Sequence, residues 1–195
     1  MKNKVIIVLI GLFFSCAKAE NTAYSLKSIQ PKDFEVFVLE NELKTVYLQS
    51  FNTVYKEYWT NELESAVLSS FDTYISKFKR SQDIFLIVTL LDTTVSGWAL
   101  FYIEHESERA ILELICVAPE HWRKGLGKRL IASIKTYYPT IKSIAVVSRK
   151  INIITPQFYQ SLGFKKTNFM LPEYNTEDVQ GYELELPNNS GTLQE

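Results

Sequence analysis

A basic, glycine-containing turn near the middle of the chain is the part of the sequence best suited to binding a charged ligand. It stands between an apolar stretch that ends at Val117 and a helical pattern. Glycines lack Cβ atoms, so a ligand can approach the backbone closely. The first amides of a helix have no intrahelical acceptor, and the helix dipole favours an anion beside them. A pyrophosphate cradle is therefore predicted at Arg123, Lys124, Gly125, Leu126, Gly127 and Lys128.

The same turn also fits a plain helix start with a solvated basic edge, because a lone Gly-x-Gly is a weak signal. It is not a Walker-type loop, since the Gly-Lys-Ser/Thr ending is absent. It is not a Rossmann fingerprint either, since the third glycine is missing and the strands before it read as antiparallel. A net charge of -1 argues against a nucleic-acid patch. The segments on both sides of the turn must decide between these interpretations.

Before the turn, the hydrophobic period changes from that of helices to that of strands. A short alternating stretch at 24–29 predicts a first strand, and a ragged helical pattern over 31–59 fits two helices that meet near Ser50. A cleaner amphipathic helix follows, with Asn61 as its cap and Glu64 reaching back to it. Three apolar runs joined by short polar turns then predict an antiparallel meander of strands at 84–91, 95–104 and 110–117.

After the turn, a helix begins at Leu126 and ends before Pro139, and a strand is expected at 141–147. A strand, a helix and a strand in this order form a right-handed crossover, which makes the two strands parallel. Gly163 closes a short helix. That helix and the two closing strands are expected at 156–162, 164–170 and 182–186.

With these elements placed, the segment from Leu114 to Leu130 resembles the central motif of the GNAT acetyltransferases. That motif is an apolar strand, then Val-x-Pro, then Gln/Arg-x-x-Gly-x-Gly/Ala, then a helix; here Trp122 stands where Gln or Arg is usual. A second motif of the family, Asn followed by Tyr and then Gly-Phe, is matched in spacing by Asn152, Tyr159, Gly163 and Phe164. The family alanine three residues after the asparagine is replaced by Thr155, and Pro156 is a further departure.

This resemblance implies an α+β fold of three layers, α/β/α, around a mixed, mostly antiparallel sheet whose parallel pair splays at the acyl-CoA site. It implies acetyl-CoA as cosubstrate, a primary amine as acceptor, and no metal. The cofactor-binding residues that it implies are Cys116, Val117, Arg123, Lys124, Gly125, Leu126, Gly127, Lys128 and Asn152.

The resemblance further implies direct attack of the amine on the thioester, without an acyl-enzyme. A lysine-like amine, with a pKa near ~10.4, is mostly protonated, so a base is needed. Glu113 is the candidate base, since partial burial would raise its pKa toward a useful value. The alternative is an outward-facing Glu113, with water or another carboxylate as the base.

Three other roles follow from the same resemblance. Tyr159 would protonate the departing CoA thiolate, and a backbone N–H near Val117 would meet the oxyanion. Asn152 would orient the pantetheine arm or Tyr159. Cys116 is better interpreted as a packed strand residue than as a nucleophile, because no carboxylate is evident to orient His121 beside it.

The first twenty residues predict a secretory signal. Two lysines precede an apolar run over 5–14, and a small-x-small pattern ends at Ala19. The expected protein is therefore exported, to the periplasm or the medium, with cleavage after Ala19. Lipid attachment at Cys16 and an uncleaved anchor are the alternatives, although the apolar run is too short for a permanent membrane span.

The composition fits one soluble globular domain, with 46% hydrophobic and 22% charged residues. The expected boundaries are 1–19 for the signal peptide and 20–195 for a single GNAT domain, with its core at about 24–187. A homodimer is left open, and neither a nucleic-acid partner nor a membrane span after cleavage is expected. Because acetyl-CoA is scarce outside the cytoplasm, the alternative function is an exported GNAT-like acyl-CoA-binding or effector module without catalysis.

Overall fold

One mixed sheet organises the part of the chain that the computed structural model describes, which is residues 23–31, 34, 37–152, 154–172, 174 and 177–187. The predicted signal peptide, with Cys16 and Ala19, and the tail from residue 188 lie outside these residues. The strands of the sheet are β1 (Tyr24–Ile29), β2 (Ile84–Leu91), β3 (Thr94–Glu104), β4 (Arg109–Val117), β5 (Ser143–Arg149), β6 (Lys165–Thr167) and β7 (Val179–Glu185). Their order across the sheet is β1-β2-β3-β4-β5-β7-β6.

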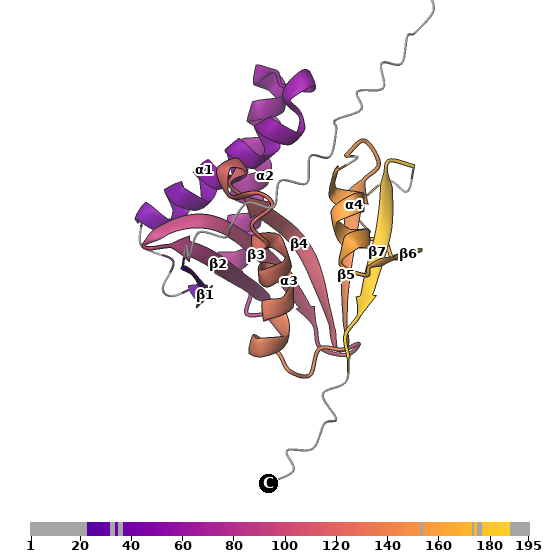
Figure 1. The fold of residues 1–195 in the computed structure, drawn as a ribbon. Coiled ribbons are helices and arrows are strands. Elements are labelled where there is room, and N and C mark those ends of the chain that lie inside the picture. Colours follow the sequence, from indigo (N-terminus) through magenta and orange to yellow (C-terminus); the bar gives the residue numbers. More distant parts are fainter. Residues whose placement is uncertain are drawn as a thin grey trace, which may run out of the picture.

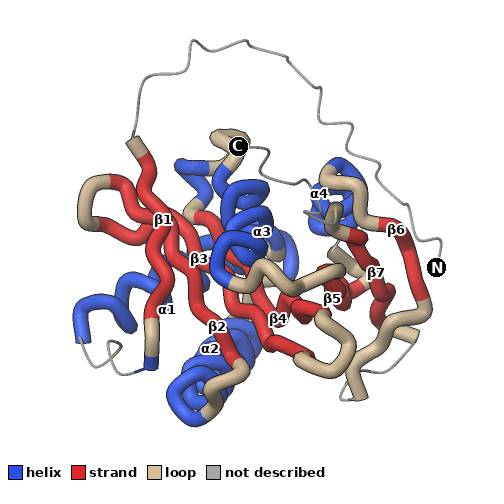
Figure 2. Tube along the Cα trace, turned by 90° about the horizontal axis from the view of Figure 1, so that it is seen from below, coloured by secondary structure: helices blue, strands red, loops and turns tan. Residues whose placement is uncertain are grey.

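Helices cover both faces of this sheet and form the outer two of three layers (Figure 1 and Figure 2). One face carries α1 (Phe37–Val54) and α2 (Asn61–Arg80), and the other carries α3 (Leu126–Tyr137) and α4 (Ile154–Ser161). Two short 3-10 turns, η2 (Lys56–Tyr58) and η3 (Pro119–His121), complete the order. The buried apolar residues fall into two clusters, one beneath each helical layer. The expected three-layer α+β fold is confirmed.

Strands β4 and β5 form the parallel pair that the crossover rule predicts, but they pair over a short length. Their register joins Arg109–Ile111 to Ser143–Ala145 and extends no further. From there the two strands separate, while β5 stays paired with β7 along its whole length. Figure 1 shows β4 and β5 close together at these paired residues, the closed end, and diverging from there. The far arm of the sheet consists of β5 and β7, with α4 beside them. The sheet is therefore splayed beside the turn that follows β4.

The N-terminal helices differ from the prediction in two details. A single helix, α1, runs through Ser50, where two helices had been expected to meet. Helix α2 is capped by Thr60 and not by Asn61, because Thr60 has an extended backbone and its hydroxyl accepts from the Leu63 amide at 3.2 Å. Glu64 does not reach back to the helix start, since its carboxylate accepts the Trp59 indole N–H at 3.2 Å.

The closing strands also differ from the prediction in their lengths. Strand β6 is three residues long, and β7 starts three residues earlier than expected. Gly181 explains part of this arrangement, since a Cβ there would lie 2.0 Å from the Phe169 carbonyl oxygen. The segment after β6 therefore crosses directly against the backbone of β7 and cannot continue as a regular strand.

Candidate active site

The basic turn has the backbone geometry of an anion cradle. Gly125 stands at the N-cap of α3 with φ 79° and ψ 3°, in the left-handed region. Arg123 also has a positive φ, of 63°, which is uncommon for a residue with a side chain. Nothing lies within 4 Å of the position that a Cβ on Gly125 would occupy, so its backbone is open to a ligand. Alternating left- and right-handed residues turn successive amides toward one point, which suits phosphate.

The basic side chains of the turn are exposed to solvent, and its apolar side chain, Leu126, is buried. Arg123, Lys124 and Lys128 are exposed, while the Leu126 side chain is buried under α3. Together with the free amides at the start of α3, these cations favour an anion at the turn. The structure thus brings together the expected pyrophosphate-binding residues at one end of α3.

Three hydrogen bonds, one to the end of β4 and two to β1, hold this turn against the sheet. The Trp122 indole N–H donates to the Val117 carbonyl at 2.6 Å, which ties the turn to the end of β4. From β1, the Tyr24 hydroxyl lies 3.2 Å from His121 Nδ1, and Arg129 Nη2 donates to the Tyr24 carbonyl at 2.8 Å. Sequence reasoning did not find Tyr24, and no local pattern could have shown that β1 lies beside residues about a hundred positions away.

Gly127 has a packing role in addition to its place in the motif. A Cβ at Gly127 would lie 2.9 Å from Cζ of Phe158, so the start of α3 and helix α4 are in close contact there. A side chain at this position would require the Phe158 ring to move. The glycine therefore couples the turn to the helix that carries Tyr159.

Glu113 is placed by a β-bulge in β4. The β3–β4 register joins Leu100 to Leu114 and Phe101 to Leu112, so Glu113 has no opposing residue. A bulge re-aims side chains and reverses the alternation of a strand. Leu112 belongs to the core cluster under α3, whereas Leu114 belongs to the cluster under α1 and α2. The mostly buried Glu113 carboxylate lies 3.8 Å from Lys77 of α2, on the α1/α2 side of the sheet.

Tyr159 projects from α4 toward the space between β4 and β5 beyond their last paired residues, Ile111 and Ala145. We call this space the splayed opening. Its ring packs against Phe158, Phe164 and Tyr182 and is almost fully buried. Burial raises the pKa of Tyr159 well above the usual tyrosine value, and the nearby Cys116 thiol adds to this increase. The tyrosine therefore stays protonated at neutral pH, and its hydroxyl is electrostatically coupled to β4 on the opposite arm.

Asn152 caps α4. Its Oδ1 accepts from the amides of Ile154 at 3.1 Å and Thr155 at 3.0 Å. Its side chain also lies near the Tyr55 hydroxyl, just after α1, and there it partly offsets the rise in the Tyr55 pKa that burial causes. Asn152 thus connects the far arm of the sheet to the α1/α2 layer, and it fixes the start of the helix that carries Tyr159.

Cys116 lies on β4 with its thiol directed into the α1/α2 core. It is buried, and its sulfur lies near the Ser50 side chain. Burial raises the pKa of the Cys116 thiol well above its ordinary value, which disfavours the nucleophilic thiolate. Of this residue, the backbone is the part that can contact a ligand in the opening.

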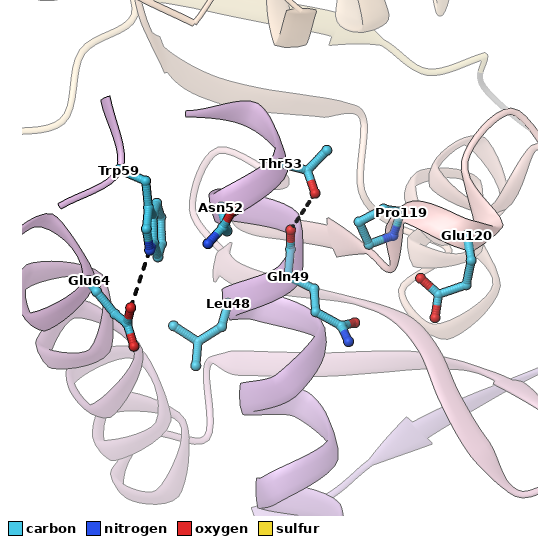
Figure 3. Close-up of a pocket in the computed structure, with 8 residues that line it drawn as sticks. All are labelled: Leu48, Gln49, Asn52, Thr53, Trp59, Glu64, Pro119 and Glu120. Atoms are coloured by element: carbon cyan, nitrogen blue, oxygen red, sulfur yellow. Dashed lines mark hydrogen bonds between the residues drawn. The ribbon is translucent and has the colours of Figure 1, made fainter. Parts of the chain in front are cut away.

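Two other features complete the local inventory. Within the described residues, no group of three His, Cys, Asp or Glu side chains is placed to hold a metal ion. A surface pocket of about 410 Å³ lies beside α1, with both polar and apolar side chains in its walls (Figure 3). It is lined by Leu48, Gln49, Asn52, Thr53, Trp59, Glu64, Pro119 and Glu120. None of Tyr47, Tyr55 and Tyr159 lines this pocket.

A sequence model of the acetyltransferase (GNAT) family matches residues 48–164, which include the splayed strands, the basic turn and Tyr159. The chain belongs to the GNAT acetyltransferase family. No curated protein sequence matches it. The expected acyltransferase activity is thereby supported at the level of the family. Within the described residues, no helix is long and apolar enough to cross a membrane.

Solved structures support the same fold for this GNAT protein. PaiA N-acetyltransferase from Thermoplasma acidophilum, in complex with coenzyme A, matches with a TM-score of 0.68 at 18% identity, covering 84% of this chain and 99% of that one. An acetyltransferase from Thermus thermophilus matches with a TM-score of 0.62 at 17% identity, over 84% and 97%. The ribosomal-protein-S18-alanine N-acetyltransferase from Escherichia coli gives 0.56 at 15%, over 88% and 98%.

Proposed function

We propose that this protein transfers the acetyl group of acetyl-CoA to a primary amine within a ternary complex. The observation that carries the proposal is the splay of β4 from β5 directly before the left-handed turn at Gly125. A splayed strand offers backbone groups to an extended ligand, and the turn offers helix amides and three exposed cations to its phosphates. Membership in the GNAT family and a fold shared with a coenzyme A complex support the same ligand.

The residues present fit the cofactor in shape and charge. The pyrophosphate would lie on the amides around Gly125 and Leu126, with Arg123, Lys124 and Lys128 beside it. The pantetheine arm would follow β4 past Val117 and Cys116 toward the opening. Bound acetyl-CoA supplies the activated acetyl group, and the chain orients it between the two arms of the sheet.

Glu113 and Tyr159 lie at the splayed opening, and each has the chemistry for one proton transfer. Glu113 takes a proton from the acceptor ammonium, which frees the nitrogen lone pair to form the new N–C bond. As the C–S bond breaks, Tyr159 gives its hydroxyl proton to the thiolate sulfur, and the second proton that the acylated nitrogen loses returns to the Tyr159 oxygen. After the N–C bond forms and before the C–S bond breaks, the former carbonyl oxygen carries a negative charge, and a backbone N–H near Val117 stabilises it. The raised pKa of Tyr159 keeps that proton in place at neutral pH.

The decisive experiment is a thiol-release assay on the protein with acetyl-CoA and a panel of primary amines. Tyr159→Phe keeps the packed ring and removes only the acidic proton. We expect this change to lower kcat by about 10² or more, the usual share of a general acid, and to leave KM for acetyl-CoA within about threefold. Tyr58→Phe, at an exposed position, is the matched control and should keep full activity.

A binding module without catalysis is the second candidate function. The feature that favours it is the signal-like segment at 1–19, because an exported protein would meet little acetyl-CoA. Acetyl-CoA binding by calorimetry without release of free CoA in the presence of any amine on the panel would favour the module. Turnover that depends on the Tyr159 hydroxyl would exclude it.

We also propose export through residues 1–19. The support is the order of a basic start, an apolar run and a small-x-small site that ends at Ala19. Mass spectrometry of the N-terminus of the mature protein distinguishes the alternatives. Cleavage after Ala19 leaves Glu20 first, lipidation leaves a modified Cys16 first, and retention of residue 1 contradicts cleavage.

A further inference from the structure

The α1/α2 side of the splayed opening carries two opposite charges on facing strands. On β4, the bulge turns Glu113 to this side. On β5, Ile144 and Val146 pack into the core under α3, so the alternating residues, which include Arg149, point the other way. Both positions lie beyond the last paired residues, Ile111 and Ala145. Glu113 and Arg149 therefore stand on opposite arms of the same opening.

Tyrosines from three segments fill the space between these charges. Tyr47 and Tyr55 come from one side of α1, Tyr74 comes from α2, and Tyr174 comes from the segment before β7. The Tyr74 hydroxyl donates a hydrogen bond to Tyr174 and lies within electrostatic reach of Glu113. Tyr47 lies within reach of Cys116, Tyr174 and Arg149, and burial raises its pKa. These rings connect the Glu113 region to the end of β4, where Tyr159 is also coupled to Cys116.

The two charges differ in their surroundings. Glu113 has the Lys77 ammonium 3.8 Å away, so an opposite charge already lies beside it. No carboxylate in the described ranges lies within 4.0 Å of the Arg149 guanidinium, whose charge acts on the hydroxyls of Tyr47 and Tyr55. Among these described residues, the Lys77 ammonium lies beside the Glu113 carboxylate, so the Arg149 guanidinium is the charge placed to attract an acceptor that also carries an anion.

We propose that this opening is the acceptor site and that it takes an amino acid or a related small amine that carries a carboxylate. This inference rests on the proposed function. The Arg149 guanidinium binds the acceptor carboxylate, since its planar donors match that group. The rings of Tyr55, Tyr74 and Tyr174 pack against the acceptor side chain and attract its ammonium through their faces. Glu113 then faces the nitrogen that is acetylated.

Matched amines with and without a carboxylate test this assignment. The pairs are L-tyrosine with tyramine, L-phenylalanine with phenethylamine, and L-lysine with 1,5-diaminopentane. Both turnover and calorimetric binding to the CoA-loaded protein are measured, so that binding is scored even if no amine is acetylated. We expect the carboxylate-bearing member of the aromatic pairs to bind at least about tenfold more tightly, as for a charge-assisted contact. Equal or tighter binding of the amines without a carboxylate overturns the proposal.

Arg149→Gln isolates the residue on which the assignment depends. It should weaken binding of L-tyrosine and L-phenylalanine by about tenfold or more and leave tyramine, phenethylamine and the KM for acetyl-CoA unchanged. Lys165→Gln removes an exposed cation from β6 and is the matched control. A loss of the same size for tyramine as for L-tyrosine in Arg149→Gln contradicts a carboxylate contact. Absence of turnover with intact, Arg149-dependent binding would contradict catalysis and leave the acceptor assignment supported.

Discussion

Trp122 is a residue of this chain that departs from the family motif and yet has a defined place in the turn. Its indole N–H donates to the Val117 carbonyl at 2.6 Å, between the end of β4 and the cradle. The usual Gln or Arg at this position would bring a flexible polar side chain. The half-buried indole instead brings one rigid donor and a large apolar surface. Trp122 is thus a positioning residue for the backbone on which acetyl-CoA is proposed to lie.

Trp122→Phe tests this positioning role, because it keeps an aromatic ring and removes the donor. The Val117 carbonyl then loses its partner, which costs about 1–3 kcal/mol. We expect KM for acetyl-CoA to rise by about five- to fiftyfold, with a smaller change in kcat, and Tm to fall. Trp59→Phe is the control, since it removes another indole hydrogen bond, to Glu64, away from the turn. If both variants lose Tm but neither changes KM, Trp122 has only a structural role.

At this scale the sequence reveals which residue types are present but not what they contact. The basic turn, Glu113 and Tyr159 are predictable because motif spacing follows the chain. The bulge that turns Glu113 is not predictable, since it depends on the register of β3 against β4. The contact of Tyr24 with the turn depends on sheet order and has no local signal.

Helix α4 is the element on which the geometry of Tyr159 depends. It has eight residues, and helices this short need capping or packing to be stable. Asn152 supplies the cap through Oδ1, and its side chain also lies near the Tyr55 hydroxyl. The resemblance had assigned Asn152 to the cofactor, and its role as a cofactor contact stays a prediction. Its structural role is visible in the described contacts.

Two substitutions at Asn152 separate these roles. Asn152→Asp keeps an acceptor for the α4 amides and should preserve Tm, while the amide donor near Tyr55 is lost. Asn152→Ala removes the cap and should lower stability by about 0.5–2 kcal/mol, with a fall in kcat as Tyr159 loses its support. Thermal denaturation and steady-state kinetics measure both. If the two variants weaken acetyl-CoA binding equally and keep Tm, Asn152 acts on the cofactor and not through α4.

Element order is well predicted from the sequence because each strand and helix has its own hydrophobic period. The prediction failed where a tertiary contact decides the boundary. A continuous α1 through Ser50 is stabilised by the core beneath it, where Ser50 lies near Cys116. Strand β6 is short because Phe169 crosses the backbone at Gly181. Neither contact can be read from a local window.

At the scale of the whole molecule, the closed end of the splayed sheet is held by polar contacts between three strands. Arg109 of β4 lies 3.1 Å from Glu183 of β7, and Ser143 of β5 donates to the same carboxylate at 2.8 Å. These contacts stand where β4 and β5 are still paired. Within the described strands, no backbone pairing joins β4 to β5 beyond these paired residues. Contacts among buried tyrosines, Cys116 and apolar side chains take its place there. These buried tyrosines and Cys116 stabilise the fold only while they remain uncharged.

This dependence predicts a loss of stability at high pH. Burial raises the pKa values of Tyr47, Tyr74, Tyr159 and Cys116, so these groups keep their protons in the fold but lose them in the unfolded chain. Their stabilising contribution is complete below the unfolded pKa values and is lost as pH rises from there toward the folded ones. Each group that ionises only on unfolding costs about 1.4 kcal/mol per pH unit. We expect Tm to be steady near pH 7–8 and to fall steeply above about pH 10.

Tyr47→Phe identifies the source of this alkaline loss, because it removes one buried hydroxyl and keeps the ring in the core. Its Tm should fall less steeply above about pH 10 than that of the unchanged protein. Tyr58→Phe, at a side chain that is 62% exposed, should leave the slope as it is. Lysines and the terminal amine titrate in the same range, but they are common to all three proteins and cancel in the comparison. Identical alkaline slopes for Tyr47→Phe and Tyr58→Phe would show that burial of the Tyr47 hydroxyl does not contribute to the loss.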